Sequence, residues 1–136
     1  MTKKTHIAAG VAITLPIILN LKFPLLSSLG ILGSIAADWD IFLILLGFKH
    51  RTITHSILAL ALSTLLIAIL NSKIAIVWGI NYLMHLILDS FTKMGVPFFY
   101  PFNKKYYGLK TVYTGGAEDL FVDLMLIYFI FCVMYP

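Results

Sequence analysis

The apolar run over residues 74–91 constrains the fold most, because it is nearly long enough to cross a membrane as a helix and yet carries ionisable side chains. His85 and Asp89 are four residues apart and Asn81 precedes His85 by one turn, so on a helix the three share one face. Ionisable groups at membrane depth are costly and are usually paired, metal-bound or placed in a polar cavity. The run therefore predicts that other polar motifs converge on His85 and Asp89 to hold a divalent metal.

The composition places the chain among membrane proteins. Of its 136 residues, 60% are hydrophobic and 12% are charged, which is more apolar surface than a soluble domain of this size can bury. We expect one integral-membrane domain over residues 1–136, whose first helix is retained because no small-x-small cleavage site follows Leu21. The single cysteine excludes an internal disulfide. The net charge of +4 could suggest nucleic acid, but in a membrane protein the placement of the lysines matters more, and no nucleic-acid partner is expected.

Apolar segments separated by polar turns predict an all-α membrane bundle of about five transmembrane helices. We expect the spans at residues 7–21, 25–37, 57–70, 74–91 and 119–135. Glycines and serines in the second span suit close helix packing, and Thr52 or Thr54 is a suitable cap for the third. Asp38 and Asp40 are two apart, so they can serve one site only if the helix ends or unwinds there. Residues 92–117 form a long loop whose aromatic side chains suit the lipid headgroup level.

A cytoplasmic N-terminus gives a clear positive-inside bias. The inner segments then carry Lys3, Lys4, Lys49, Arg51, Lys93, Lys104, Lys105 and Lys110, and the outer turns carry Lys22 and Lys73. The same assignment puts all four histidines and all six acids toward the inner ends of the spans. Scattered solubilising charge would not sort so completely, so we expect a polar site that faces the cytoplasm from the cell (inner) membrane.

Histidine nitrogen and carboxylate oxygen suit Zn²⁺, with Mn²⁺ or Fe²⁺ as alternatives. The His85/Asp89 pair can hold one ion or bridge two, Asp40 and His55 come from adjoining segments, and His6 can close the site. A metal-bound water is a nucleophile at neutral pH, and a second ion nearby would clamp the attacked group. One of the DWD acids can instead orient a histidine.

The remaining polar residues have open roles. The planar guanidinium of Arg51 matches two phosphate oxygens. Its positive charge could instead serve only to keep this segment on the cytoplasmic side. His50 can be a ligand, an acid–base group or an interface residue. Asp119 and Asp123 are candidate site members, but a helix N-terminus favours acids in any case.

The motifs DWD (38–40), HRTITHS (50–56), HLILD (85–89) and GVPFFYPF (95–102), together with His6, resemble the YdjM-like family over nearly the whole chain. That family is described as LexA-binding, inner-membrane-associated, metal-dependent hydrolases. A more distant similarity is to zinc-dependent phospholipase C and the single-strand-specific zinc nucleases. Their ligand order is an early His, an Asp about fifteen residues before a His, and an H-x-x-x-D pair whose Asp bridges two ions. No histidine follows His85, so Asp119 and Asp123 would have to replace later ligands, and we expect two ions.

These arguments predict a membrane-embedded metal-dependent hydrolase, acting on a phosphoester of a lipid at the cytoplasmic leaflet. The expected metal ligands are His6, Asp40, His55, His85, Asp89 and Asp123, and the expected catalytic residues are Asp38, His50, Arg51 and Asp119. One alternative is a metal-ion or proton transporter, which the nearly apolar outer halves of the last three spans disfavour. Another is a non-catalytic membrane scaffold stabilised by metal, which would lack an open coordination position.

Overall fold

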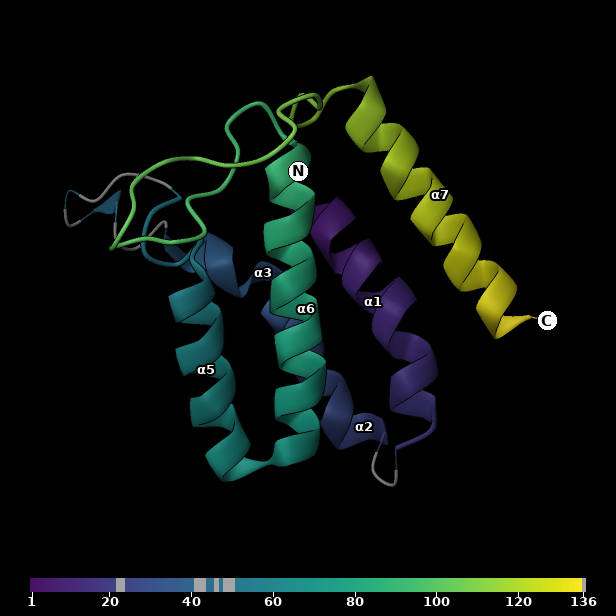
Figure 1. The fold of residues 1–136 in the computed structure, drawn as a ribbon. Coiled ribbons are helices and arrows are strands. Elements are labelled where there is room, and N and C mark those ends of the chain that lie inside the picture. Colours follow the sequence, from purple (N-terminus) through teal and green to yellow (C-terminus); the bar gives the residue numbers. More distant parts are fainter. Residues whose placement is uncertain (22–23, 41–43, 46, 48–50, 136) are drawn as a thin grey trace.

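The fold is built around one central helix. The computed structural model describes residues 1–21, 24–40, 44–45, 47 and 51–135, and in this part of the chain it forms helices and no strand. Helix α6 (Ser72–Phe91) lies between α5 (Ile57–Leu70) and α1 (Lys3–Leu19), and α7 (Ala117–Met134) packs on α1 (Figure 1). The all-α prediction is thus confirmed. The helices begin within a few residues of the predicted spans.

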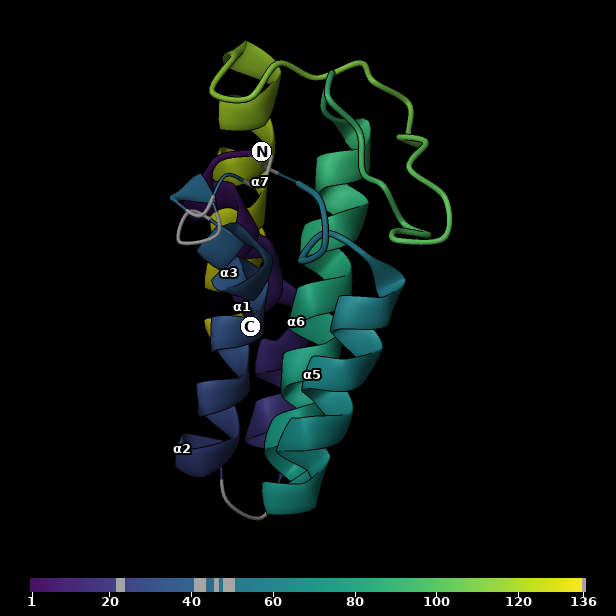
Figure 2. The same cartoon turned by 90° about the vertical axis from the view of Figure 1, so that its left-hand side faces the viewer.

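The second predicted span is a helical path broken into short pieces. It runs through α2 (Pro24–Ser27), η1 (Ser28–Leu32), α3 (Gly33–Ala36) and η2 (Ala37–Asp40), where η1 and η2 are 3₁₀ turns. This path packs against α6 and α1, on the side of the molecule that Figure 2 brings into view. The winding therefore changes at the DWD motif, as a shared site for its two acids requires.

Glycines bring this broken path close to α6. A Cβ added at Gly33 would lie 2.5 Å from the carbonyl oxygen of Trp78, and one at Gly30 would lie 2.6 Å from Cβ of Val77. Neither position has room for a side chain. The prediction that small residues of this segment serve helix packing is confirmed.

Helices α1, α5 and α6 each begin with a side-chain cap, whereas α7 begins after Gly116, which has no side chain to serve as one. Thr2 Oγ1 accepts from the amide of Thr5 at the start of α1, and Asn71 Oδ1 accepts from Lys73 and Ile74 at the start of α6. At α5 the cap is Ser56, whose Oγ accepts from Ala59 N at 3.1 Å. The prediction of Thr52 or Thr54 at this position was wrong.

The reason for the different cap lies in the backbone. Ser56 has the extended conformation that a cap needs (φ −118°, ψ 154°). The carbonyl of Thr54 instead accepts a 2.5 Å hydrogen bond from Tyr82 Oη of α6. His55 is therefore held just before the helix, one residue ahead of its cap.

The long loop after α6 folds back over the end of the bundle. Isolated bridges pair Thr92 with Val112 and Val96 with Tyr107. The amide of Ile57 donates to the carbonyl of Phe98 at 2.9 Å, which fastens the loop to the first residue of α5. The loop therefore covers the segment that carries His55.

Polar groups lie inside the molecule and large apolar side chains outside. Three histidines are among the largest fully buried side chains of the described residues. Helix α5, which is described in full, buries no residue, and Leu66 and Ile69 are exposed on it. Among the described helices, only α6 is both long enough and apolar enough to cross a membrane. The predicted bundle of five transmembrane helices is therefore not confirmed.

Candidate metal centre

Four side chains from three segments converge beside the end of α6. They are Asp38 of η2, His55 before α5, and His85 and Asp89 in the last turns of α6. Each offers one ligand atom, and all these atoms lie within 4.8 Å of one another. The side chains of His55, His85 and Asp89 are fully buried, whereas that of Asp38 is 15% exposed.

The spacing of these atoms fits a tetrahedral ion. His55 Nε2 lies 3.4 Å from His85 Nε2, and the two nitrogens lie 3.4 and 3.5 Å from Asp89 Oδ2. Asp38 Oδ1 is 3.6 Å from His85 Nε2 and 3.9 Å from His55 Nε2. A tetrahedral ion bound at its usual distances separates its ligands by about 3.3–3.6 Å. The three buried atoms match this spacing, and Asp38 is slightly further away.

The outer nitrogens of both histidines have partners that fix the rings. His85 Nδ1 lies 2.6 Å from the carbonyl oxygen of Ser34, which can only accept, so Nδ1 carries the proton and Nε2 presents a lone pair to the group. His55 Nδ1 faces Thr54 Oγ1 at 3.1 Å and Asp40 Oδ2 at 3.7 Å. With its proton on Nδ1, toward Thr54 and Asp40, His55 also presents Nε2 to the group as a lone pair.

Burial keeps His55 in the form that binds metal. Removal from water lowers the pKa of its imidazole below the usual value, because desolvation disfavours the charged ring, and the nearby carboxylate of Asp89 only partly offsets this. Two imidazole lone pairs and carboxylate oxygens therefore face one point. Such a set repels itself unless a cation lies between its members, so these residues fit a divalent ion.

The two acids of the DWD motif lie at opposite edges of His55. Asp38 approaches the Nε2 side, and Asp40, which is buried, approaches the Nδ1 side. The 3₁₀ winding of η2 makes this possible, because residues two apart no longer point to opposite sides as they nearly do on an α-helix. Asp38, expected to be catalytic, is thus one of the four converging residues, and Asp40, expected to be a ligand, lies on the Nδ1 side of His55 away from them.

His6 lies against the group from α1. Its ring stacks on that of His85 with centroids 3.8 Å apart and an interplanar angle of 17°. His6 Nε2 is 3.2 Å from Asp89 Oδ1, the oxygen that the α-amino group of Met1 also contacts. The two oxygens of Asp89 therefore face different partners, with His6 on one and the group on the other.

Arg51 is buried beside the same carboxylate. Its Nη2 lies 2.8 Å from Asp89 Oδ2, and its Nη1 donates to Thr92 Oγ1 at 2.7 Å. Its backbone adopts the left-handed conformation (φ 56°), which is uncommon for a residue with a side chain and is found at functional sites. Asp40 Oδ2 accepts from the amide of Arg51, and Tyr106 Oη donates to its carbonyl, so both sides of this turn are held.

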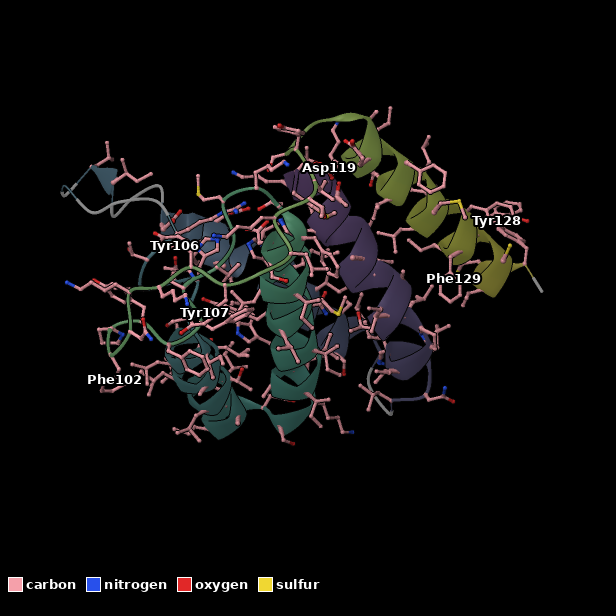
Figure 3. All side chains as sticks on the ribbon, turned by 45° about the horizontal axis from the view of Figure 1, so that its top comes forward. Phe102, Tyr106, Tyr107, Asp119, Tyr128 and Phe129 are labelled. Carbon is pink, nitrogen blue, oxygen red and sulfur yellow. The ribbon has the colours of Figure 1, made fainter. Side chains whose placement is uncertain are left out.

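The acids of α7 lie outside the four-residue group. Asp119, in the first turn, is buried and accepts from Thr2 N at 2.9 Å, Thr5 Oγ1 at 2.6 Å and Gly115 N at 2.8 Å. Figure 3 shows Asp119 where α7 meets the start of α1. Asp123 lines a cavity of about 350 Å³ beside it. These contacts tie α7 to α1. His50, the last expected site residue, lies outside the described residues.

Some residues of the site had no signal in the sequence. Ser34 contributes a backbone carbonyl, which any residue could offer, and Tyr106 comes from a loop whose aromatics were assigned to the membrane surface. Thr92 follows Asp89 by three residues at the end of α6, and this spacing could have indicated its place beside Arg51.

The comparisons with known proteins agree with the motifs. The family model described as YdjM inner membrane protein matches residues 1–135. No curated protein and no solved structure matches the chain, so the distant similarity to zinc-dependent phospholipase C and the zinc nucleases stays a prediction. Because the match covers nearly the whole sequence, the chain belongs to the family of YdjM inner membrane proteins.

Proposed function

We propose that the protein is a membrane-embedded metal-dependent hydrolase that cleaves a phosphoester of a lipid at the cytoplasmic leaflet. The observation that carries the proposal is the convergence of His55 Nε2, His85 Nε2 and Asp89 Oδ2, with Asp38 Oδ1 close by. A bound divalent ion supplies Lewis acidity and activates water for attack on phosphorus. The residue set suits zinc, with manganese or iron as alternatives.

The four side chains differ in a way that favours catalysis over a purely structural metal. A structural zinc site is closed by four protein ligands, whereas a catalytic one keeps a position open. His55, His85 and Asp89 are fully buried and form the tighter set. Asp38 is the partly exposed and more distant member. It is placed to take a proton from the attacking water at the open side.

Arg51 and His6 surround this core with further functional groups. Arg51 compensates the charge of Asp89, and its Nε has no hydrogen-bond partner among the described residues. This N–H is the donor that remains for a phosphate oxygen. His6 and Asp89 Oδ1 form the pair that would hold a second ion, as the sequence predicts.

The membrane part of the proposal rests on the exterior of the molecule. The family is described as inner membrane proteins, α6 is long and apolar enough to cross, and α5 and α7 present large apolar side chains outward. A bilayer is the solvent that such a surface fits. We assign several crossings, with the N-terminus and the metal centre on the cytoplasmic side, where most lysines then lie.

The proposal is tested by metal analysis and a lipid-phosphate hydrolysis screen on the purified protein. Asp89→Asn should lose stoichiometric metal and all turnover. Asp38→Asn should keep metal but lose about 10²-fold or more in kcat, the usual contribution of a general base. Wild-type protein without a stoichiometric divalent metal contradicts the enzyme. Metal without turnover of any phosphoester leaves a metal-stabilised scaffold or a transporter.

A further inference from the structure

An apolar groove runs along α5 from its first residue. Its first part, of about 270 Å³, lies between the start of α5 and the aromatic loop and is lined by Ile57, Ala61, Phe98, Phe99 and Phe102. Its second part, of about 490 Å³, continues between α5 and α6 past Thr64, Ala68, Gly79 and Leu83. Both parts share Ile57 and Ala61. The groove thus extends about 17 Å along the helix at the α-helical rise per residue.

The groove begins at the first residue of α5, close in the chain to His55. Ile57, at its head, follows His55 by two residues, and its amide is bonded to the carbonyl of Phe98. His55 is a member of the metal-ligand group. A molecule lying in the groove therefore has one end at the start of α5, two residues from His55 along the chain, and the rest against apolar side chains.

The same end of the groove carries positive charge. Phe99, in the groove wall, packs edge to face on Tyr107 with ring centroids 5.5 Å apart, and Lys105 Nζ lies 5.8 Å from the centroid of the Tyr107 ring. Lys104 is exposed next to it in the chain. Figure 3 shows Phe102 and Tyr107 on the loop side of the molecule, away from α7. Cationic groups at the head of an apolar groove complement an anionic amphiphile.

We propose that this groove binds one acyl chain of a lipid with an anionic phosphate headgroup, and holds its phosphoester at the metal centre. The inference rests on the proposed function for the identity of the reacting bond, but the binding itself does not depend on turnover. The groove selects lipids by two features: a tail that fills the space along α5, and a headgroup that pairs with Lys104 and Lys105.

The test is photolabelling of the whole protein in phosphatidylcholine nanodiscs. The probe is a trace of phosphatidic acid whose acyl chain carries a diazirine, and labelled residues are mapped by mass spectrometry. Helix α7, with Tyr128 and Phe129 exposed, reports ordinary contact with bulk lipid. We expect labelling of residues 57–68 to exceed that of α7 by about tenfold, equivalent to about 1.4 kcal/mol of preferential binding, because the lysines attract the anionic headgroup.

Matched variants locate the binding. Ala61 is exposed and lines both parts of the groove, so Ala61→Phe should fill the space and bring labelling of α5 down to the level of α7. Leu62→Phe, on the same helix but outside the groove lining, should change nothing. A diazirine diacylglycerol, which lacks the phosphate, should label α5 no more than α7, and Lys105→Gln should weaken the preference for phosphatidic acid.

Several outcomes would contradict the binding of a lipid tail in this groove. These are equal labelling of α5 and α7, labelling unaffected by Ala61→Phe, and α5 crosslinked mainly to a second copy of the chain. The His85→Ala variant separates this inference from the proposed function, because it should bind metal below one equivalent but keep the labelling pattern. The predicted pattern in a wild-type protein without turnover would support the groove and contradict the hydrolase.

Discussion

At the scale of single residues, Asp89 is the hub of the site. Its Oδ2 faces His55, His85 and Arg51, and its Oδ1 faces His6. Each of these neighbours comes from a different part of the chain or a different turn of α6. A buried carboxylate needs such partners, because a charge removed from water is stable only when it is paired or bound to metal. The same partners fix where a divalent ion can sit.

The orienting role of Asp40 gives a first prediction. Asp40→Asn keeps an oxygen for the amide of Arg51 but removes the charge beside His55 Nδ1. We expect metal affinity to fall about 10–100-fold, the usual cost of losing an outer-shell partner of a metal-binding histidine. Competition with a chromogenic chelator measures this loss.

Asp123→Asn is the matched control for that experiment. Asp123 lies on α7 beside the cavity lined by Lys4 and Asp119, outside the four-residue group, so its variant should bind metal like the wild type. If Asp123→Asn loses as much affinity as Asp40→Asn, α7 contributes a ligand and our assignment of the centre fails.

The cap of α5 gives a second prediction. Ser56→Ala removes the oxygen that accepts from Ala59 N, and should lower the free energy of unfolding by about 1 kcal/mol. Ser56→Thr keeps the oxygen and should cost much less. Thermal unfolding in detergent compares the two variants, and equal losses would show that capping is not what holds this turn.

The sequence indicated the residues that gather at this site, but not how each of them is placed. Histidine and aspartate at a four-residue spacing in an apolar run indicated His85 and Asp89 directly. Asp38 and Asp40 lie on opposite sides of His55 because of a 3₁₀ turn, and no residue of the motif indicates that turn. Asp119 was assigned to catalysis because of its type and position, but its three hydrogen bonds join α7 to α1.

At the scale of elements, the broken helical path over residues 24–40 sets the depth of the site. Gly30 and Gly33 let this path touch the backbone and side chains of α6. Ser34 then meets His85, and η2 carries Asp38 and Asp40 to His55. The close approach is therefore a condition for the geometry of the centre, as well as for packing.

A third prediction follows at Gly33. Gly33→Ala would place a Cβ 2.5 Å from the carbonyl oxygen of Trp78, and backbone cannot easily move. We expect the variant to lose about 1–3 kcal/mol of stability, the usual cost of overpacking, and to bind metal more weakly. Thermal unfolding and metal titration of the same preparation check both effects.

Gly79→Ala is the graded control. Its Cβ would lie 3.1 Å from the Cγ2 methyl of Thr64, a side chain that can give by a few tenths of an ångström. The gain of about 1 kcal/mol in helix propensity should roughly offset this contact. Equal destabilisation by both alanines would mean that the approach at Gly33 has no special importance.

The helices themselves could be predicted from apolar runs, but their caps and internal breaks were harder to predict. Residues 57–70 were expected as one helix and form α5 with the same bounds. The cap at Ser56 was missed because three hydroxyl residues precede the helix and only the backbone conformation distinguishes them. The 3₁₀ turn η1 was missed because Gly- and Ser-rich sequence is compatible with a continuous helix, whereas a change of winding at the DWD motif was the condition set for a site shared by its two acids.

At the scale of the whole molecule, the distribution of polar groups is inverted relative to a soluble domain. Histidines and acids are enclosed, while leucines, isoleucines and phenylalanines of α5 and α7 are exposed. The sequence predicted this apolar exterior from composition, and it predicted the bounds of α5 as well. Helix α5 has 14 residues, so it rises about 21 Å, short of the ~30 Å hydrocarbon core.

A fourth prediction concerns the orientation in the membrane. In a Cys132→Ser background, Ser72→Cys at the α5–α6 turn should react with an impermeant maleimide added to intact cells. Leu109→Cys in the lysine-containing loop should react only after the inner membrane is opened. Reaction of both from the same side would contradict the multi-pass arrangement with a cytoplasmic metal centre.

The central claim, that distant histidines and acids jointly chelate one cation, is tested most directly by X-ray absorption at the zinc K-edge of the zinc-loaded protein. We predict two imidazole ligands, with oxygen ligands completing a shell at about 2.0–2.2 Å, and loss of one imidazole contribution in a His85→Ala variant that still retains some zinc. A protein that retains no stoichiometric zinc, or a zinc shell without imidazole, would contradict the account.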